Sequence, residues 1–594
     1  MINRTTKLRW RRRIKRSRLQ VEDYNQSAEA SLEKNLFRRL DKLIYVKRFV
    51  ITWVVLVVLL ITLTVIQVFN MSQYYQTLRY VSGGSFYEGV VGSFSNANPL
   101  FATSDADTTV SSLIFDGLFK YNQKDQLVGD LAQSWSVSSN GQNFTVKLRP
   151  NIHWQDGVPI TASDVVFTYN TIENPNVESP LFNNWYGIKV SEVNSRTIEF
   201  KLPSPLSSFP DALTNGIVPK HILSNIPTDQ LQSANFNNVN PIGSGPFKFS
   251  EITVKDSASN NSSEQVELVP NTRYFLGKPR LDSFNLVSFN NVSDMIASFE
   301  KQNIQAMIGL NNVPSYLKTD SSVYINNIPL TAETMVFYQN ASVLLSNSQM
   351  REALTRAVNI NQVISALGYP VIVARSPLLP FQTGYNAAAN QVTDQPIEAA
   401  SLFNSLGWTL SSNGYRYKGG QQLQFSLYTQ DNSEYQAVAR SLISQWKKAG
   451  VNVSLVLLST DDLKSVIANK SYDMLLYSIS IGIDPDVFAY WDSSQAQLNS
   501  IPGLNLSQYK SATADTSLAQ GRTVFDPALR AIKYLTFLQD WEQDNPSLAL
   551  YQPNYVYITR PKISGLNLVR INNGVNVYSN VANWEIKQVE VTNK

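Results

Sequence analysis

The stretch TVKLRPNIHWQDGVPITASDVVFTYNTI, residues 145–172, predicts a strand, a tight turn and a helix in close succession. Its first residues alternate between apolar and polar side chains, which is the period of a half-buried strand. Asp156–Gly157 is a pair typical of tight turns. Thr161 and, three residues later, Asp164 match the capping box that precedes a helix, here ASDVVFTYNTI. Local backbone structure therefore accounts for the polar residues of this stretch.

His153 lies three residues before Asp156, and the two could form a catalytic pair or belong to this scaffold. A hydrolase needs a nucleophile, an oriented base and an oxyanion site, and the sequence has no Gly-x-Ser-x-Gly motif or comparable arrangement. We therefore expect a structural role for the pair and no enzyme activity.

The composition of the 594-residue chain excludes several kinds of site. Because there is no cysteine, the chain has no disulfide, no thiolate nucleophile and no cysteine-based zinc site. Two histidines also argue against metal chemistry, and we expect neither a metal nor another cofactor. The length allows several domain-sized hydrophobic cores.

The formal charge of +4 is unevenly distributed along the chain. Residues 1–48 contain 15 Lys or Arg, including the run RWRRRIKRSR (9–18), against five acidic residues. That leaves 35 of the 50 basic and 41 of the 46 acidic residues for the rest of the chain, which is mildly acidic. We therefore expect no nucleic-acid partner.

Residues 49–69, FVITWVVLVVLLITLTVIQVF, contain no charged side chain. As a helix they would span about 30 Å, the thickness of the hydrocarbon core of a membrane. A buried core helix is seldom apolar on all sides over this length, and a cleaved signal peptide has a shorter apolar region and a small-residue cleavage site. The sequence thus predicts a single transmembrane helix.

The positive charges precede this helix, and the next one after it is Arg79. The positive-inside rule places residues 1–48, a basic arm, in the cytoplasm and everything from about residue 70 in an extracellular or periplasmic position. Within the arm, residues 28–48 could form an amphipathic helix on anionic headgroups or remain a solvated tail. Residues 70–85 are expected to be a linker.

Beyond the membrane segment, predicted strands and helices alternate as in βαβ units, which favours an α/β fold. The polar stretch 255–265 is expected to be a loop between paired strands. A second series of helices and strands begins near residue 348, so two lobes are expected. The expected strands are 266–269, 284–289, 306–310, 451–458 and 472–480, and the expected helices are 292–302, 348–367 and 434–450.

Residues 98–172 resemble the N-terminal signature of family 5 extracellular solute-binding proteins, the oligopeptide- and dipeptide-binding components of ABC importers. The matches cover most of residues 85–560, and their order and spacing make the resemblance specific. The further matches are GIVPKHIL (216–223), NPIGSGPFKF (240–249), NTRYFLGKPRLDSF (271–284), MREALTRAVN (350–359) and SYDMLLYSISIGIDPDVFAYWDSSQ (471–495).

The resemblance implies a bilobed periplasmic-binding-protein-like fold of type II, in its large family 5 form, in which the chain crosses twice between lobes. It also implies that His153 and Asp156 lie in a structural hairpin away from the ligand cleft. The implied partners are an oligopeptide or small-molecule solute and ABC permease subunits, and we expect a monomer. The expected ranges are 86–334 and 553–594 for the first lobe, 335–552 for the second, and crossing strands near 333–338 and 548–553.

Two departures from the family pattern bear on function. Many relatives are anchored by a lipidated cysteine, which this chain lacks, so the transmembrane helix would supply the tether. Peptide-binding relatives commonly carry Trp-x-x-Asp shortly before Asp-Pro, and that aspartate pairs with the peptide's α-amino group. Here YSISIGIDPD places Tyr477 near the tryptophan position and Ile481 near the aspartate position, which weakens the peptide assignment.

The same segment supplies most candidate ligand-binding residues, because family position puts it at the end of a second-lobe strand. A carboxylate there could receive a cationic group, or it could cap a turn or start a helix. The glycines of GSGP (243–246) could touch solute or form a backbone bend. The candidates are Tyr477 and Trp491 as apolar walls, Ser478 and Ser480 as hydrogen-bonding groups, Asp484 and Asp486 as carboxylates, and Gly245.

The leading hypothesis is a membrane-anchored binding protein that closes two lobes around a small polar solute and delivers it to an ABC permease. The alternative is a single-pass receptor whose ectodomain senses a ligand. The basic arm motivates that alternative, although 48 residues are too few for a kinase-like output domain. An exported hydrolase is a third hypothesis, and it lacks a catalytic constellation.

Overall fold

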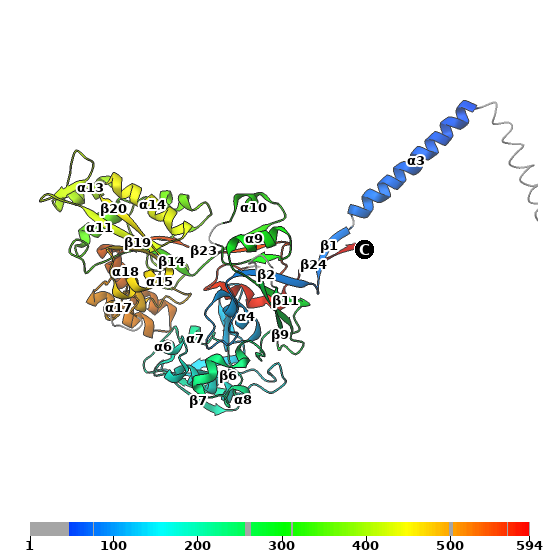
Figure 1. Ribbon diagram of the computed structural model, residues 1–594, viewed down its shortest axis with the longest axis horizontal. Coiled ribbons are helices and arrows are strands. Elements are labelled where there is room, and N and C mark those ends of the chain that lie inside the picture. Colours follow the sequence, from blue (N-terminus) through cyan, green and yellow to red (C-terminus); the bar gives the residue numbers. More distant parts are fainter. Residues whose placement is uncertain are drawn as a thin grey trace, which may run out of the picture. The chain divides into compact units, whose positions relative to one another are not determined.

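The computed structural model describes residues 47–74, 76–255, 263–310, 313–497, 503–566 and 568–592 (Figure 1). The chain divides into two compact units, Met1–Arg79 with Gln588–Lys594 and Tyr80–Lys587.

The first unit contains helix α3 (Lys47–Tyr74), which includes the predicted apolar helix. Phe49–Phe69 is long and apolar enough to cross a membrane, and the protein buries none of it. The hydroxyls of Thr62 and Thr64 donate to backbone carbonyls one turn earlier at 2.7 Å, so these polar groups are satisfied within the helix. Strands β1 (Gln76–Val81) and β24 (Lys587–Thr592) form a two-stranded sheet. Most of the possible amphipathic segment at 28–48 lies outside the described residues.

A seven-stranded sheet in the order β13-β23-β12-β2-β11-β10-β9 forms the first core of the second unit. Strand β2 (Ser85–Val91) runs parallel to β11 (Ser283–Phe289) and β12 (Ala306–Met307), and α9 (Val292–Glu300) connects the latter two. The predicted βαβ unit is therefore confirmed. β12 is shorter than the expected 306–310, because Gly309 adopts a φ of +75°, which ends the extended conformation. The remaining strands are β9 (Phe247–Lys255), β10 (Ser263–Pro270), β13 (Tyr324–Pro329) and β23 (Asn554–Thr559).

The stretch 145–172 folds as predicted into the end of β6 (Asn143–Leu148), a turn and helix α5 (Ala162–Glu173). The Asp164 carboxylate accepts hydrogen bonds from the backbone N–H and the hydroxyl of Thr161, at 2.9 and 3.1 Å, in the predicted capping box. Strand β6 belongs to a four-stranded sheet, β5-β6-β8-β7, against which α5 packs. The other strands of this sheet are β5 (Ala132–Val137), β7 (Lys189–Asn194) and β8 (Thr197–Lys201).

A six-stranded sheet, ordered β15-β22-β14-β21-β19-β20, forms a separate core. Strands β21, β19 and β20 are parallel, whereas β14 is antiparallel to β21 and β22. One apolar cluster packs α11 to α14 on one face, and another packs α15 to α18 on the other. The strands are β14 (Ala332–Tyr338), β15 (Ile372–Val373), β19 (Gln424–Gln430), β20 (Asn452–Leu458), β21 (Met474–Ser480) and β22 (Ser547–Gln552), and the helices are α11 (Ser348–Arg356), α12 (Ile360–Ile364), α13 (Pro396–Ser405), α14 (Ser433–Lys448), α15 (Thr460–Asn469), α16 (Phe488–Trp491), α17 (Ala512–Thr523) and α18 (Pro527–Asp544).

The single helix predicted over 348–367 is wrong, since the structure has two helices there. α11 ends at Arg356, and α12 starts after Asn359, whose side chain accepts a hydrogen bond from the Gln362 N–H at 2.9 Å. Asparagine caps a new helix more favourably than it continues an old one, which explains the break. The helix predicted over 434–450 and the strands predicted over 451–458 and 472–480 are confirmed as α14, β20 and β21.

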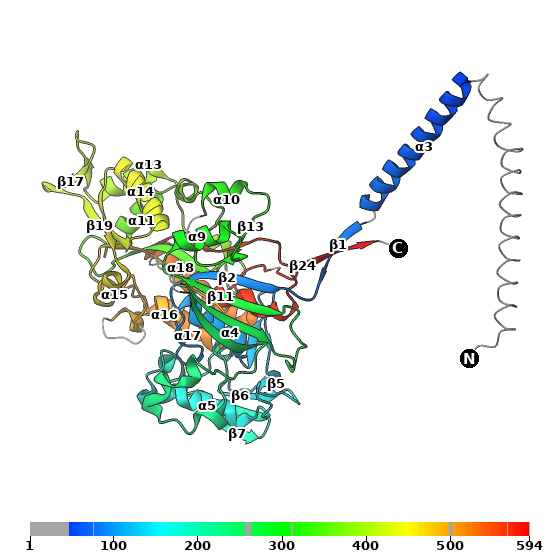
Figure 2. The ribbon, with the colours of Figure 1, turned by 45° about the vertical axis from the view of Figure 1, so that its right-hand side comes forward.

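The chain passes from the first large sheet to the second at Leu330–Thr331 and returns at Pro553. We call residues 85–330 and 553–587 the first lobe and residues 331–552 the second lobe. Sheet membership thus changes just before β14, ahead of the expected boundary at 334/335. In Figure 2 the four-stranded sheet and α5, in cyan, lie below β2 and β11, while α13 and α14 lie above them.

Candidate functional site

The junction of the two lobes brings together strand ends from both large sheets. The carboxyl end of β21 lies at the crossover, because Ser480 pairs with Ala332, the first residue of β14. β12 of the first lobe also ends toward the crossover, since Met307 pairs with Ile558 of β23, which begins there. Ligands of open α/β sheets bind outside the carboxyl ends of parallel strands. The junction is therefore the candidate binding site.

The loop that follows β21 is fixed to the crossover by backbone hydrogen bonds. The N–H groups of Ile481 and Gly482 both donate to the carbonyl of Thr331, at 2.9 and 3.0 Å. The Thr331 hydroxyl donates to the side-chain oxygen of Asn572 in the first lobe. The Gln382 amide donates to the Gly482 carbonyl at 2.8 Å. The segment expected to face the solute is thus held in place from both lobes.

Asp484 is paired with an arginine of its own lobe. The Arg530 guanidinium binds both carboxylate oxygens at 2.5 Å, and the two side chains are only 7% and 17% exposed. Burial alone would lower the pKa of Arg530. The hydrogen bonds and the charge of Asp484 outweigh this effect, so the pKa of Arg530 lies above its usual range. Asp484 also accepts the Asp486 N–H at 3.0 Å, which is the turn-capping role considered from the sequence.

Asp486 links the two lobes. Its Oδ2 accepts a hydrogen bond from Arg522 at 3.0 Å and another from the Ser208 hydroxyl of the first lobe at 2.9 Å. It does not cap α16, because the residue before that helix is Val487. Both aspartates of the segment therefore already have cationic partners inside the protein.

Tyr121 and Asp211 supply a second polar pair on the first-lobe side of the junction. The Tyr121 hydroxyl donates to the Asp211 carboxylate at 2.5 Å. Burial raises the pKa of Asp211 to about 7, and the nearby Asp484 charge adds to this, while the Tyr121 hydrogen bond and Arg530 oppose it. Asp211 therefore lies within electrostatic range of Asp484 and Arg530 in the second lobe.

Arg570 of the first lobe also reaches the second lobe. Its guanidinium lies 3.8 Å from the centre of the Phe381 ring, a cation–π contact. Its Nε lies 3.7 Å from a carboxylate oxygen of Asp125. Burial raises the pKa of Asp125 to about 7, and Arg570 opposes that shift. The junction thus offers an aromatic surface beside a cation.

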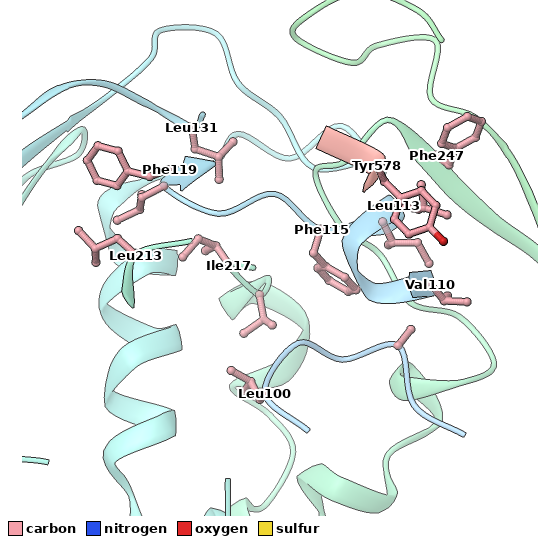
Figure 3. Close-up of a cluster of buried hydrophobic side chains, with 14 of the residues drawn as sticks. Leu100, Val110, Leu113, Phe115, Phe119, Leu131, Leu213, Ile217, Phe247 and Tyr578 are labelled. Atoms are coloured by element: carbon pink, nitrogen blue, oxygen red, sulfur yellow. The ribbon is translucent and has the colours of Figure 1, made fainter. Parts of the chain in front are cut away.

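A cavity of about 780 Å³ in the first lobe includes Tyr121 and Asp211 among its lining residues. Its volume falls in the range of small-molecule sites. Phe115 and Phe119, drawn in Figure 3 among the neighbouring buried side chains, contribute apolar surface, and Asn573 contributes an amide.

The charges around this cavity are internally compensated. Lys120 pairs with Asp130 at 2.8 Å. Burial, followed by the charge of Asp130, raises the pKa of Asp116 well above its usual value. All lining residues of this cavity belong to the first lobe.

The candidates on β21 face different sides of the sheet. Tyr477 lies on the β21 face that packs against α15 to α18, whereas Ser478 lies on the opposite face. The Ser478 hydroxyl bonds to Thr334 at 2.6 Å and accepts from Tyr435 at 2.9 Å. The exposed Ser480 provides its carbonyl to the Tyr490 hydroxyl at 2.6 Å. The alternating strand therefore cannot present Tyr477 and Ser478 to one solute surface.

Trp491 and Gly245 have structural surroundings. Trp491 is fully buried and stacks on Phe337 with ring centres 6.0 Å apart, so it is not an exposed cleft wall. Gly245 donates its N–H to the Ile114 carbonyl at 2.7 Å, and a Cβ at Gly245 would lie 2.7 Å from that backbone. A Cβ at Gly243 would come still closer, 2.0 Å from the Ile114 carbonyl oxygen, so both glycines suit the backbone bend considered for GSGP.

Sequence reasoning missed the residues that complete the junction. Arg522 and Arg530 lie in helices without a recognisable binding motif, and Tyr121, Asp211 and Arg570 come from distant parts of the first lobe. Tertiary folding alone brings these residues to the junction, so no local pattern could have identified them.

Asp156 pairs with His221, not with His153. The His221 Nε2 lies 2.8 Å from Asp156 Oδ2. The His153 Nδ1 lies 3.1 Å from the carbonyl oxygen of Asn151, two residues earlier in the chain. Among the residues that the structure describes, neither histidine forms a hydrogen bond with a serine hydroxyl. Within the described ranges, no three His, Asp or Glu side chains gather in a metal-binding arrangement.

Comparison with known proteins identifies the relatives of this architecture. The model of the bacterial extracellular solute-binding proteins, family 5 Middle, matches residues 126–500. The chain is 27% identical over 491 residues to the oligopeptide-binding protein AppA of Bacillus subtilis, covering 80% of this chain and 87% of that protein.

Solved structures show the same fold. NikZ of Campylobacter jejuni, in complex with Ni(L-His), is similar with a TM-score of 0.70 and 25% identity, covering 84% of this chain and 99% of that one. AppA of Bacillus subtilis, in complex with a nonapeptide, has a TM-score of 0.68 and 24% identity. The similarity covers 86% of this chain and 100% of that one. The bilobed α/β architecture is thus shared with proteins that hold quite different ligands.

Proposed function

Because this chain belongs to the family 5 bacterial extracellular solute-binding proteins, we propose that it is the solute-binding component of an ABC importer. It binds a peptide or another small polar solute at the junction of its two lobes. It acts by binding and delivery to permease subunits, without catalysing a reaction.

The observation that carries this proposal is the polar network that spans the junction. Ser208 of the first lobe donates to Asp486 of the second at 2.9 Å, and Asp211, which accepts from Tyr121, lies within electrostatic range of the Asp484–Arg530 ion pair. Only two chain crossings join the lobes, which permits hinge motion. A solute that contacts both lobes stabilises the arrangement in which these contacts exist together.

The charge arrangement supports a solute without a strongly basic group. Arg530 and Arg522 already neutralise Asp484 and Asp486, and Ile481 offers no carboxylate. A cationic solute would have to displace an internal arginine. The aspartates therefore serve mainly to shape the loop, and the solute interacts with its backbone and with polar groups such as Tyr121.

We also infer that α3 tethers the binding unit to a membrane. Phe49–Phe69 has the length and composition of a membrane span, and the basic residues 1–48 favour a cytoplasmic N-terminus. In this arrangement the binding unit stays beside its permease without a lipid anchor.

The proposal is tested with a purified fragment of residues 80–587, the second compact unit. Thermal unfolding is followed with defined pools of synthetic peptides of two to nine residues and with pools of small neutral metabolites. A bound solute raises the unfolding temperature, because it stabilises the folded protein by RT ln(1 + [solute]/Kd), and calorimetry then measures Kd for the active component. Absence of any saturable binding across both kinds of pool would contradict the proposal.

A further inference from the structure

A second set of inter-lobe contacts lies apart from the two chain crossings. It joins the corner between α17 and α18 of the second lobe to two loops of the first lobe. Figure 1 shows α17 beside the region of α6 (Phe182–Trp185) and α7 (Phe209–Ala212). We call the contacts of Ser207, Ser208, Asp486, Arg522 and Phe525 the clasp.

The polar half of the clasp is centred on Arg522. Its guanidinium binds Asp486 at 3.0 Å and lies 4.2 Å from the centre of the Phe488 ring. Its backbone carbonyl accepts hydrogen bonds from the N–H and the hydroxyl of Ser207, at 2.9 and 3.0 Å. Ser208 completes the contact by donating to Asp486 at 2.9 Å. Two consecutive serines of the first lobe thus bond to two parts of the second.

The apolar half of the clasp is formed by Phe525. Its ring packs against Phe144 of the first-lobe core, with ring centres 5.8 Å apart and planes inclined by 53°. Gly141 faces the same ring, and a Cβ at that position would come within 2.7 Å of it. Gly141 has a φ of +72°, so the turn both needs glycine and leaves room for the phenylalanine. The first lobe therefore has a receptive surface for Phe525.

Every group in the clasp belongs to the chain itself, so the contact requires no solute. The Asp486 side chain is only 11% exposed, which shields its hydrogen bonds from competition with water. We propose that the clasp holds the two lobes together independently of solute and that Ser208, Arg522 and Phe525 set the balance between open and closed protein. These are positioning residues, since they act through lobe geometry.

The full chain permits a direct test, because it has no native cysteine to interfere with labelling. Val193→Cys in β7 of the first lobe and Ile397→Cys in α13 of the second lobe replace side chains that are 60% and 81% exposed. Spin labels at these two positions report the distance between lobes by pulsed electron paramagnetic resonance. The protein is measured in lipid nanodiscs with no solute added.

Ser208→Ala removes a hydrogen bond to a charged group, which is expected to lower the ratio of closed to open protein roughly tenfold or more. Phe525→Ala is expected to shift the distances in the same direction. Ser208→Thr keeps the hydroxyl and should preserve the wild-type distribution. Ile532→Ala shortens a side chain on α18 that is 66% exposed. It is the control for a general effect of shortening an apolar side chain in the second lobe.

Longer distances in Ser208→Ala and Phe525→Ala, with Ser208→Thr and Ile532→Ala unchanged, would support the clasp. Identical distributions in all five proteins, wild type included, would overturn it. The effect on solute affinity rests on the proposed function, but the distance measurement does not. A shift in distances without any detectable solute binding would leave the clasp intact and count against the importer role alone.

Discussion

The guanidinium of Arg530 binds both carboxylate oxygens of Asp484 at 2.5 Å, next to the loop that family resemblance assigns to the solute. This bidentate geometry is the strongest form of side-chain ion pair. It fixes the loop after β21, and the Asp484 charge also contributes to the raised pKa of Asp211 across the junction. The same ion pair therefore holds the loop after β21 in place and influences the pKa of Asp211 in the other lobe.

Removing the Asp484 charge should destabilise the protein. Asp484→Asn leaves the largely buried Arg530 without its counter-charge, so we expect the free energy of unfolding to fall by about 3 kcal/mol. Urea denaturation of residues 80–587 measures this change. Asp461→Asn is the matched control, since its 92% exposed carboxylate forms only a surface pair with Lys464 and should produce no measurable change. Equal stability of Asp484→Asn and wild type would contradict a structural role for the pair.

Glu88 should make stability decrease as pH rises. It is fully buried on β2 and accepts hydrogen bonds from the hydroxyls of Tyr557, at 2.5 Å, and Tyr578. Burial raises the pKa of Glu88 from 4.5 to about 7, despite the opposing effect of these hydrogen bonds. Its protonated form thus contributes stability that is fully present below pH 4.5 and is lost as pH rises to about 7.

Glu88→Gln removes this titration while keeping a hydrogen-bonding side chain. Denaturation series from pH 4.5 to 8 should show the variant gaining stability relative to wild type as pH increases, by up to about 3 kcal/mol. Parallel curves for the two proteins would show that Glu88 does not take up its proton on folding.

Glu333 on the crossing strand β14 provides a complementary prediction. Both of its carboxylate oxygens are buried without a hydrogen-bond partner among the described residues, and burial raises its pKa well above the usual value. Glu333→Met replaces this unsatisfied group with an apolar side chain of similar length. We expect the free energy of unfolding at pH 7 to rise by about 1 to 3 kcal/mol, measured by urea denaturation. A loss of stability would indicate that Glu333 has a favourable partner.

The proposed membrane orientation can be tested with reporters. A fusion at residue 5 should behave as intracellular, and one at residue 594 as extracellular, because the positive charges precede the apolar helix. Alkaline phosphatase and green fluorescent protein fusions at both positions provide opposite readouts. The reverse pattern would reject the assignment of the N-terminus to the cytoplasm.

Local sequence signals predicted much of the fold. The capping box of Thr161 and Asp164, the βαβ unit of β11, α9 and β12, and helix α14 all depend on residues close in sequence. The break at Asn359 was missed because apolar periodicity continues across it, while capping by its side chain decides the local structure. Gly309 likewise ended a strand that hydrophobicity alone would have extended.

The candidate site was less predictable because its residues meet only in three dimensions. The segment around Asp484 could be selected from family resemblance, but its partners Arg530 and Arg522 lie dozens of residues later. Strand alternation decides that Tyr477 and Ser478 face opposite ways, and burial of Trp491 depends on how α16 packs against Phe337. Side-chain direction and packing therefore determine which candidates remain available to a solute.

The most direct test of the central claim is the distance between spin labels at Val193→Cys and Ile397→Cys during titration with a solute identified by the peptide and metabolite pools. If the lobes close around the solute, the shorter-distance population grows with solute and saturates over the concentration range that calorimetry gives for binding. Saturable binding with an unchanged distance distribution would contradict closure of the two lobes around the solute.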